Sequence, residues 1–89
     1  MYFDQKDFGQ RLRMLRKDRS MTQEQLAAAL HIGTDHYGRI ELGKRGISID
    51  LLLDIAEVLE ISIDFLVTGK PQTAWKVKTL IWQMRELLD

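Results

Sequence analysis

The stretch that most constrains the fold of this chain runs from Thr22 to Gly43, TQEQLAAALHIGTDHYGRIELG. It holds two apolar-periodic segments of about two helical turns each, separated by a break of about three residues at 31–33. Helices shorter than roughly 12–15 residues are marginal in water, so neither segment is stable alone. The break lets the second helix cross the first at a steep angle, and both apolar faces then meet one core. The chain must therefore fold as short helices packed on one another.

The second of these helices, expected to run to about residue 41, has a face that the core does not need. At about 100° per residue, Tyr37 and Ile40 point together into the core. The opposite face carries Thr34, Asp35, Gly38 and Arg39. This arrangement is typical of a helix-turn-helix, which presents one narrow polar helix to a groove.

Side chains that accept hydrogen bonds from free backbone N–H groups mark the expected helix starts. These side chains are Asp4, Thr22, Ser48 and Ser62. Thr22 is followed three positions later by Gln25, which is a capping-box pattern. The helix after Ser62 is expected to stop at Gly69 and Pro71.

The pattern therefore predicts five helices within residues 1–70 and a sixth after a brief linker. The sixth is expected over residues 73–88, where apolar residues recur at helical spacing. No segment shows the alternation of a strand. The chain is predicted to be all-α, with a helix-turn-helix domain at 1–70 and a linker plus amphipathic helix at 71–89.

Several protein classes are disfavoured by composition. The chain has 89 residues and no cysteine, which excludes disulfides and thiolate metal sites and is compatible with a reducing cytoplasm. His31 and His36 have no clustered acidic ligands, so no metal or cofactor is expected. No apolar run approaches the roughly 18 residues of a membrane span, and the N-terminus lacks a signal-peptide pattern. We find no nucleophile–base pair, phosphate loop or paired carboxylates and therefore predict no enzyme.

Charge is distributed unevenly along the chain although the total is zero. Residues 1–45 carry nine Lys or Arg against six Asp or Glu, whereas residues 46–89 carry four against seven. A basic front half of this kind favours a polyanionic partner.

Four motifs together resemble the phage repressor/Cro-type (XRE) helix-turn-helix family over roughly residues 6–69. They are GQRLRMLR at 9–16, TQEQLA at 22–27, RIELGKR at 39–45 and the spaced apolar residues of 52–69. Each motif is weak alone, but their order and spacing are those of the family. The chain departs from the family at His31, where Gly is common, and at Gly33, where Ser or Thr is common. Tyr37 stands at a usually aliphatic position, so its hydroxyl needs a partner.

The resemblance implies that the second helix of the motif reads DNA bases. The residues concerned are Thr34, Asp35, His36, Gly38 and Arg39. Arg can bind guanine through two hydrogen bonds, and Asp can accept one from cytosine N4. Alternatively, Asp35 merely stabilises the helix N-terminus, and Arg39 forms a surface ion pair. Gly38 either lets the helix backbone approach DNA closely or is simply tolerated.

The resemblance also places Gln23, Lys44 and Arg45 on DNA phosphates. The alternative for each is a solvated surface group. The resemblance further pairs Arg16 with Glu41. We interpret that pair as structural, because it would hold the recognition helix in place.

We expect two copies of the chain to form a homodimer through the terminal helix, because a palindromic operator requires two recognition helices. Its expected interface residues are Trp75, Leu80, Ile81, Met84 and Leu88. The alternative is packing on the first and fifth helices of the same chain. The sequence thus predicts a cytoplasmic, bacterial or phage-encoded repressor that binds specific double-stranded DNA, with no small-molecule effector indicated. A competing hypothesis is an antitoxin-like protein-interaction module on the same fold.

Overall fold

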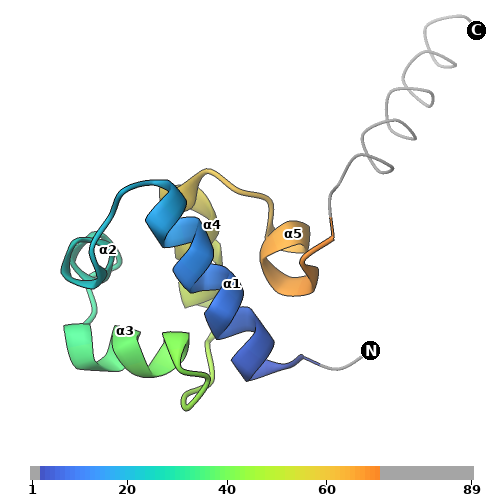
Figure 1. Cartoon of the computed structure of the whole chain (residues 1–89), viewed down its shortest axis with the longest axis horizontal. Helices are drawn as coiled ribbons and strands as arrows, with labels where there is room; N and C mark the ends of the chain where they lie inside the picture. Colours follow the sequence, from blue (N-terminus) through green and yellow to red (C-terminus); the bar gives the residue numbers. More distant parts are fainter. Residues whose placement is uncertain (1–2, 71–89) are drawn as a thin grey trace, which may run out of the picture.

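The computed structural model describes residues 3–70, which form five α-helices and no strand (Figure 1). The helices are α1 (Gln5–Asp18), α2 (Gln23–Ala29), α3 (Thr34–Glu41), α4 (Ile49–Leu59) and α5 (Ile63–Thr68). The all-α prediction is confirmed for this part of the chain. The expected linker and sixth helix at 71–89 lie outside the described residues. None of the helices in 3–70 has the length and apolarity that crossing a membrane requires.

The helix starts lie where the capping residues predicted them. Asp4, Thr22, Ser48 and Ser62 each accept a hydrogen bond from a backbone N–H of the first helical turn. At α2 the capping box is complete, because Thr22 Oγ1 accepts from the Gln25 N–H at 3.0 Å and Gln25 Oε1 accepts from the Thr22 N–H at 2.8 Å. A side-chain cap of this kind stabilises a helix by about 1 kcal/mol. The start of α3 differs, since its N-cap is Gly33 and no side chain caps it.

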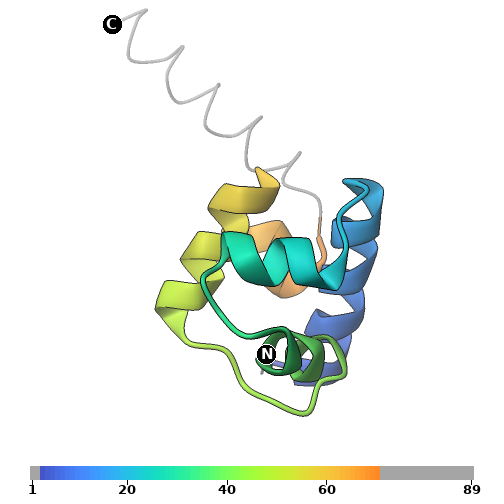
Figure 2. The same cartoon turned by 90° about the vertical axis from the view of Figure 1, so that its left-hand side faces the viewer.

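The break between α2 and α3 is a tight reversal at His31. Its backbone adopts a left-handed conformation with φ of 58°, which histidine tolerates better than most residues do. The N–H groups of His31 and Ile32 donate to the carbonyls of Ala28 and Ala27, which closes the end of α2. Figure 1 shows α3 lengthwise and α2 end-on, and Figure 2 shows the reverse, so the two helices cross steeply as predicted.

The core lies where these helices meet. Its fully buried large side chains come from all five helices: Phe8, Leu12, Leu26, Tyr37, Ile40, Ile55, Leu59 and Leu66. The backbones of α1 and α3 approach each other closely at Gly9. A Cβ atom there would lie 2.6 Å from the Ile40 carbonyl oxygen and would overlap that of Glu41. The backbone of α3 is therefore held directly against α1, which fixes the orientation of its outer face.

Two arginines of the basic front half donate hydrogen bonds to the C-terminal ends of helices that lie far along the chain. Arg11 donates to the carbonyls of Leu66 and Val67 at 2.9 Å each, at the end of α5. Arg19 donates to the Leu59 carbonyl at 2.6 Å, at the end of α4. A cation at a helix C-terminus also interacts favourably with the helix dipole. These two charges are thus engaged by the fold itself.

Candidate nucleic-acid interface

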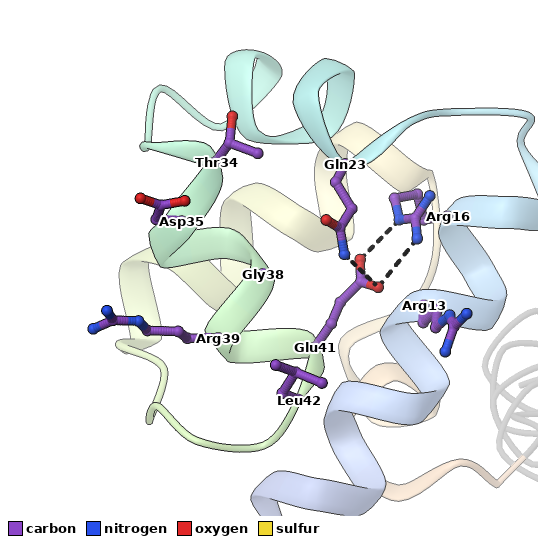
Figure 3. A pocket seen from close by; sticks show the side chains of 9 residues that line it. All are labelled: Arg13, Arg16, Gln23, Thr34, Asp35, Gly38, Arg39, Glu41 and Leu42. Atoms are coloured by element: carbon purple, nitrogen blue, oxygen red, sulfur yellow. Dashed lines mark hydrogen bonds and ion pairs between the residues drawn. The ribbon is translucent and has the colours of Figure 1, made fainter.

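A cleft of about 710 Å³ opens between α1, α2 and α3 (Figure 3). The residues that line it are Arg13, Arg16, Gln23, Thr34, Asp35, Gly38, Arg39, Glu41 and Leu42. All four residues expected on the outer face of α3 are among them. Thr34, Asp35 and Arg39 are exposed, whereas Gly38 is half-buried. The packing of Tyr37 and Ile40 into the core turns this face outward.

The floor of the cleft is an ion pair between α1 and α3. Arg16 Nε donates to Glu41 Oε2 at 2.8 Å, and a second guanidinium nitrogen donates to Glu41 Oε1 at 3.1 Å. A third bond runs from Arg16 Nη1 to the Met21 carbonyl at 2.8 Å. The two side chains are 8% and 2% exposed, so this is a buried, two-point contact. It ties α3 to α1 across the bottom of the cleft.

Gln23 extends the same network to α2. Its Nε2 donates to Glu41 Oε1 at 3.4 Å, so its amide nitrogen faces the floor. Burial alone would raise the pKa of the Glu41 carboxyl, but interactions with Arg16, with the Tyr37 hydroxyl and with Gln23 hold that pKa below its ordinary value. The hydrogen bond to Glu41 likewise raises the pKa of Arg16. Both groups therefore remain charged, and their charges cancel.

Tyr37 lies beside this pair and is fully buried. Its hydroxyl makes no hydrogen bond of ordinary length within residues 3–70, although it interacts with the neighbouring Glu41 carboxylate and Arg16 guanidinium. Burial raises the pKa of the hydroxyl strongly, and the nearby Glu41 carboxylate adds to the effect. The side chain therefore fills core volume while its polar atom lacks a well-formed hydrogen bond inside the described part of the chain.

The exposed residues that line the cleft around the Arg16–Glu41 floor form its rim, and two of them were not predicted from the sequence. Arg13 is exposed on α1 and makes no ion pair or hydrogen bond with any residue of the described chain. Leu42 ends α3 and is 64% exposed. The position of Arg13 off the apolar face of its helix was a usable signal. Leu42 gave none, because an exposed leucine on a polar face follows no periodicity rule.

Three predicted residues do not line the cleft. His36 is half-buried on α3, outside the set that surrounds the cavity. Lys44 and Arg45 are exposed in the loop that follows α3. The Lys44 N–H donates to the Arg39 carbonyl at 3.0 Å, so this loop begins as a continuation of the helix end. Both basic side chains therefore start close to the end of α3.

A family model for helix-turn-helix proteins matches residues 12–66, well over half of the chain. This chain belongs to the helix-turn-helix family. The XRE-type resemblance inferred from the four motifs is thus confirmed.

Curated relatives of this helix-turn-helix protein carry the names of regulators. The HTH-type transcriptional regulator YazB of Bacillus subtilis is 44% identical over 59 residues, which cover 66% of this chain and 86% of YazB. The HTH-type transcriptional regulator YqaE of the same species is 33% identical over 63 residues, which cover 71% of this chain. The match spans 54% of YqaE, so the chain spans about half the length of that relative.

A solved structure agrees with the same assignment. The restriction-modification controller protein C.AhdI of Aeromonas hydrophila superposes with a TM-score of 0.68 at 36% identity. The superposition covers 71% of this chain and 96% of the controller protein. The fold that positions the cleft is therefore shared with a protein whose name denotes a controller.

Charge in the helix-turn-helix cleft is modestly positive. The floor is neutral because Arg16 and Glu41 cancel. Arg13 and Arg39 have no side-chain partner within residues 3–70, and Asp35 supplies the one exposed carboxylate among the lining residues. In Figure 3 the Arg13 and Arg39 side chains extend from opposite sides of the cleft.

Proposed function

We propose that this helix-turn-helix protein is a transcriptional regulator that binds specific double-stranded DNA by inserting α3 into the major groove. The observation that carries the proposal is the outer face of α3. It combines exposed hydrogen-bonding side chains with two arginines, Arg13 and Arg39, that no side chain within residues 3–70 neutralises. A major groove about 12 Å wide admits one α-helix. Regulator names among the relatives support the same function.

Within this proposal, the start and middle of α3 read base edges. Arg39 donates two hydrogen bonds to guanine, and Asp35 accepts from cytosine N4 or adenine N6. Thr34 donates or accepts at a neighbouring base. His36 lies in the first turn of α3, outside the lining of the cleft, and a base contact from it stays a prediction.

Phosphate contacts surround the base-reading face. Arg13 belongs with Gln23, Lys44 and Arg45 in this group, because all four side chains lie on or beside the rim of the cleft or at the end of α3. Such contacts set the position of the protein on the duplex and carry no sequence information.

We further propose that the protein acts as a homodimer on a palindromic operator and represses transcription by occupying it. Support comes from the apolar residues at helical spacing in 73–88. Two α3 helices about 34 Å apart would meet successive major grooves. Leu80→Asp is expected to halve the mass measured by light scattering. An unchanged mass would move the interface away from Leu80.

Selection of bound duplexes from a random pool tests the function directly. We expect one sequence to be enriched, with two half-sites related by symmetry. The Arg39→Ala variant should lose preference at one position of each half-site. Lys17→Ala is the matched control, because Lys17 is exposed on α1 outside the cleft, and it should select the wild-type sequence. Absence of any enriched sequence would overturn the proposal and favour a protein partner instead.

A further inference from the structure

Gly38 is a glycine that the fold does not require. It lies in the middle of α3, where glycine costs roughly 1 kcal/mol relative to alanine. A Cβ atom built there would meet only the Gln23 Oε1 atom, at 3.9 Å, which is an ordinary contact. Gly9 shows the opposite case, because a Cβ there would collide with the backbone of α3. The chain thus carries a destabilising glycine at a position with room for a side chain.

Leu42 poses a complementary question. It lies one helical turn beyond Gly38, so the two positions share a face of α3. Its side chain is 64% exposed, although the rest of this face is polar. Both residues line the cleft, and Figure 3 shows them along the edge of α3 that faces α1 and α2. A bare backbone and an exposed apolar side chain therefore adjoin on the proposed recognition surface.

We propose that Gly38 and Leu42 form an apolar subsite for the C5-methyl group of a pyrimidine in the major groove. The inference rests on the proposed DNA binding and adds a specificity determinant to it. The C5-methyl is the apolar feature that a base pair presents in this groove. Gly38 leaves space for the base edge to approach the helix, and Leu42 supplies the apolar surface that covers the methyl group.

Charge around the subsite favours this occupant over an apolar peptide. Arg13 and Arg39 line the same cleft and have no partner within the described residues. A duplex brings phosphates to such cations while it offers methyl groups to the surface between them. Thymine and 5-methylcytosine carry the same group, so the subsite would accept either base.

The test uses the full chain and the operator enriched from two random pools, one with cytosine and one with 5-methylcytosine. The base enriched at the contacted position identifies which pyrimidine is the source of the methyl group. In that operator each thymine is then replaced by uracil, or each 5-methylcytosine by cytosine. We expect the dissociation constant to rise about fourfold at one position per half-site, the effect of one buried methyl group.

Three variants assign that effect to the subsite. Leu42→Ala should bind the methylated and unmethylated operators equally. Gly38→Ala should melt at a higher temperature than the wild type, because alanine favours the helix, and yet lose the preference for the methyl group. Leu53→Ala is the matched control, since Leu53 is 46% exposed on α4 outside the cleft, and it should retain the full preference.

The outcomes separate this inference from the function on which it rests. A pool with no enriched sequence removes the DNA-binding proposal itself. Enrichment with no methyl effect at any position overturns the subsite alone. So does a methyl effect that persists in both Leu42→Ala and Gly38→Ala.

Discussion

The floor and the rim of the cleft use the same side chain in opposite ways. Arg16 and Arg13 lie three residues apart on α1 and line the same cavity. The Arg16 side chain is buried and bonded to a carboxylate and a carbonyl, whereas the Arg13 side chain is exposed and bonded to no described residue. Burial forces a charge to find a partner inside the protein, while exposure leaves it available to a ligand. The comparison therefore predicts that floor variants lose stability and rim variants lose binding.

The largest effect is expected from Arg16→Ala. Removing one partner leaves the Glu41 carboxylate buried and unpaired, which should lower the free energy of unfolding by about 3–5 kcal/mol. Urea denaturation followed by circular dichroism measures this change. Arg13→Ala should shift the same free energy by less than about 0.5 kcal/mol. Equal losses in the two variants would abolish the distinction between floor and rim.

Arg39→Ala should lower the affinity for DNA without changing the free energy of unfolding. We expect the affinity for the selected operator to fall by about 1–3 kcal/mol, with relaxed preference at one base pair. Titration of labelled duplexes that differ at single positions measures both quantities. A uniform loss on every duplex would make Arg39 a phosphate contact. A lowered free energy of unfolding would assign it to the floor.

Tyr37→Phe tests the buried Tyr37 hydroxyl, which lies beside the Arg16–Glu41 pair. The variant removes a buried hydroxyl that makes no hydrogen bond of ordinary length within residues 3–70, so the free energy of unfolding should rise by about 1 kcal/mol. Thermal denaturation detects the change. A destabilised Tyr37→Phe variant would mean that the hydroxyl does contribute a bond.

Arg13→Ala should reveal itself through salt rather than through stability. Loss of one phosphate contact is expected to reduce the slope of log affinity against log salt concentration by about 0.9. Affinities measured at several salt concentrations give this slope. Lys17→Ala should leave it unchanged, and an identical slope for Arg13→Ala would remove that residue from the interface.

The Arg16–Glu41 pair should also determine how the free energy of unfolding falls at acidic pH. The folded state lowers the pKa of the Glu41 carboxyl below its ordinary value, so the pair stabilises the protein fully above that ordinary value. Its contribution should disappear as the pH falls through the lower, folded-state pKa. Urea midpoints measured between pH 7 and about pH 3 should therefore decline less steeply in Glu41→Gln than in the wild type. Parallel declines would place the titrating group elsewhere.

Local rules carried much of the prediction. The four capping residues and the periodicity of α3 depend on atoms within about one helical turn, so the printed sequence contains what is needed to recognise them. The face formed by Thr34, Asp35, Gly38 and Arg39 follows from the 3.6-residue repeat in the same way. Lys44 and Arg45 were harder to place, because a loop has no repeat that orients its side chains.

The roles of the arginines required knowledge of the fold. Arg11 bonds to a carbonyl 55 residues away, and Arg16 bonds to a carboxylate 25 residues away. A count of basic residues in the front half treats these two as equal to Arg13, which has no such bond. The resemblance to the family suggested the partner of Arg16 but gave no role to Arg11 or Arg19.

The amino-acid sequence by itself determines the helix starts, the reversal at His31 and the outward face of α3. Each of these arises from interactions between near neighbours in the chain. The packing of distant helices settles which charges are neutralised, which polar atom is stranded at Tyr37, and which glycine has room for a side chain. Those properties depend on burial and on partners far along the sequence, and neither exists until α1, α2 and α3 have come together.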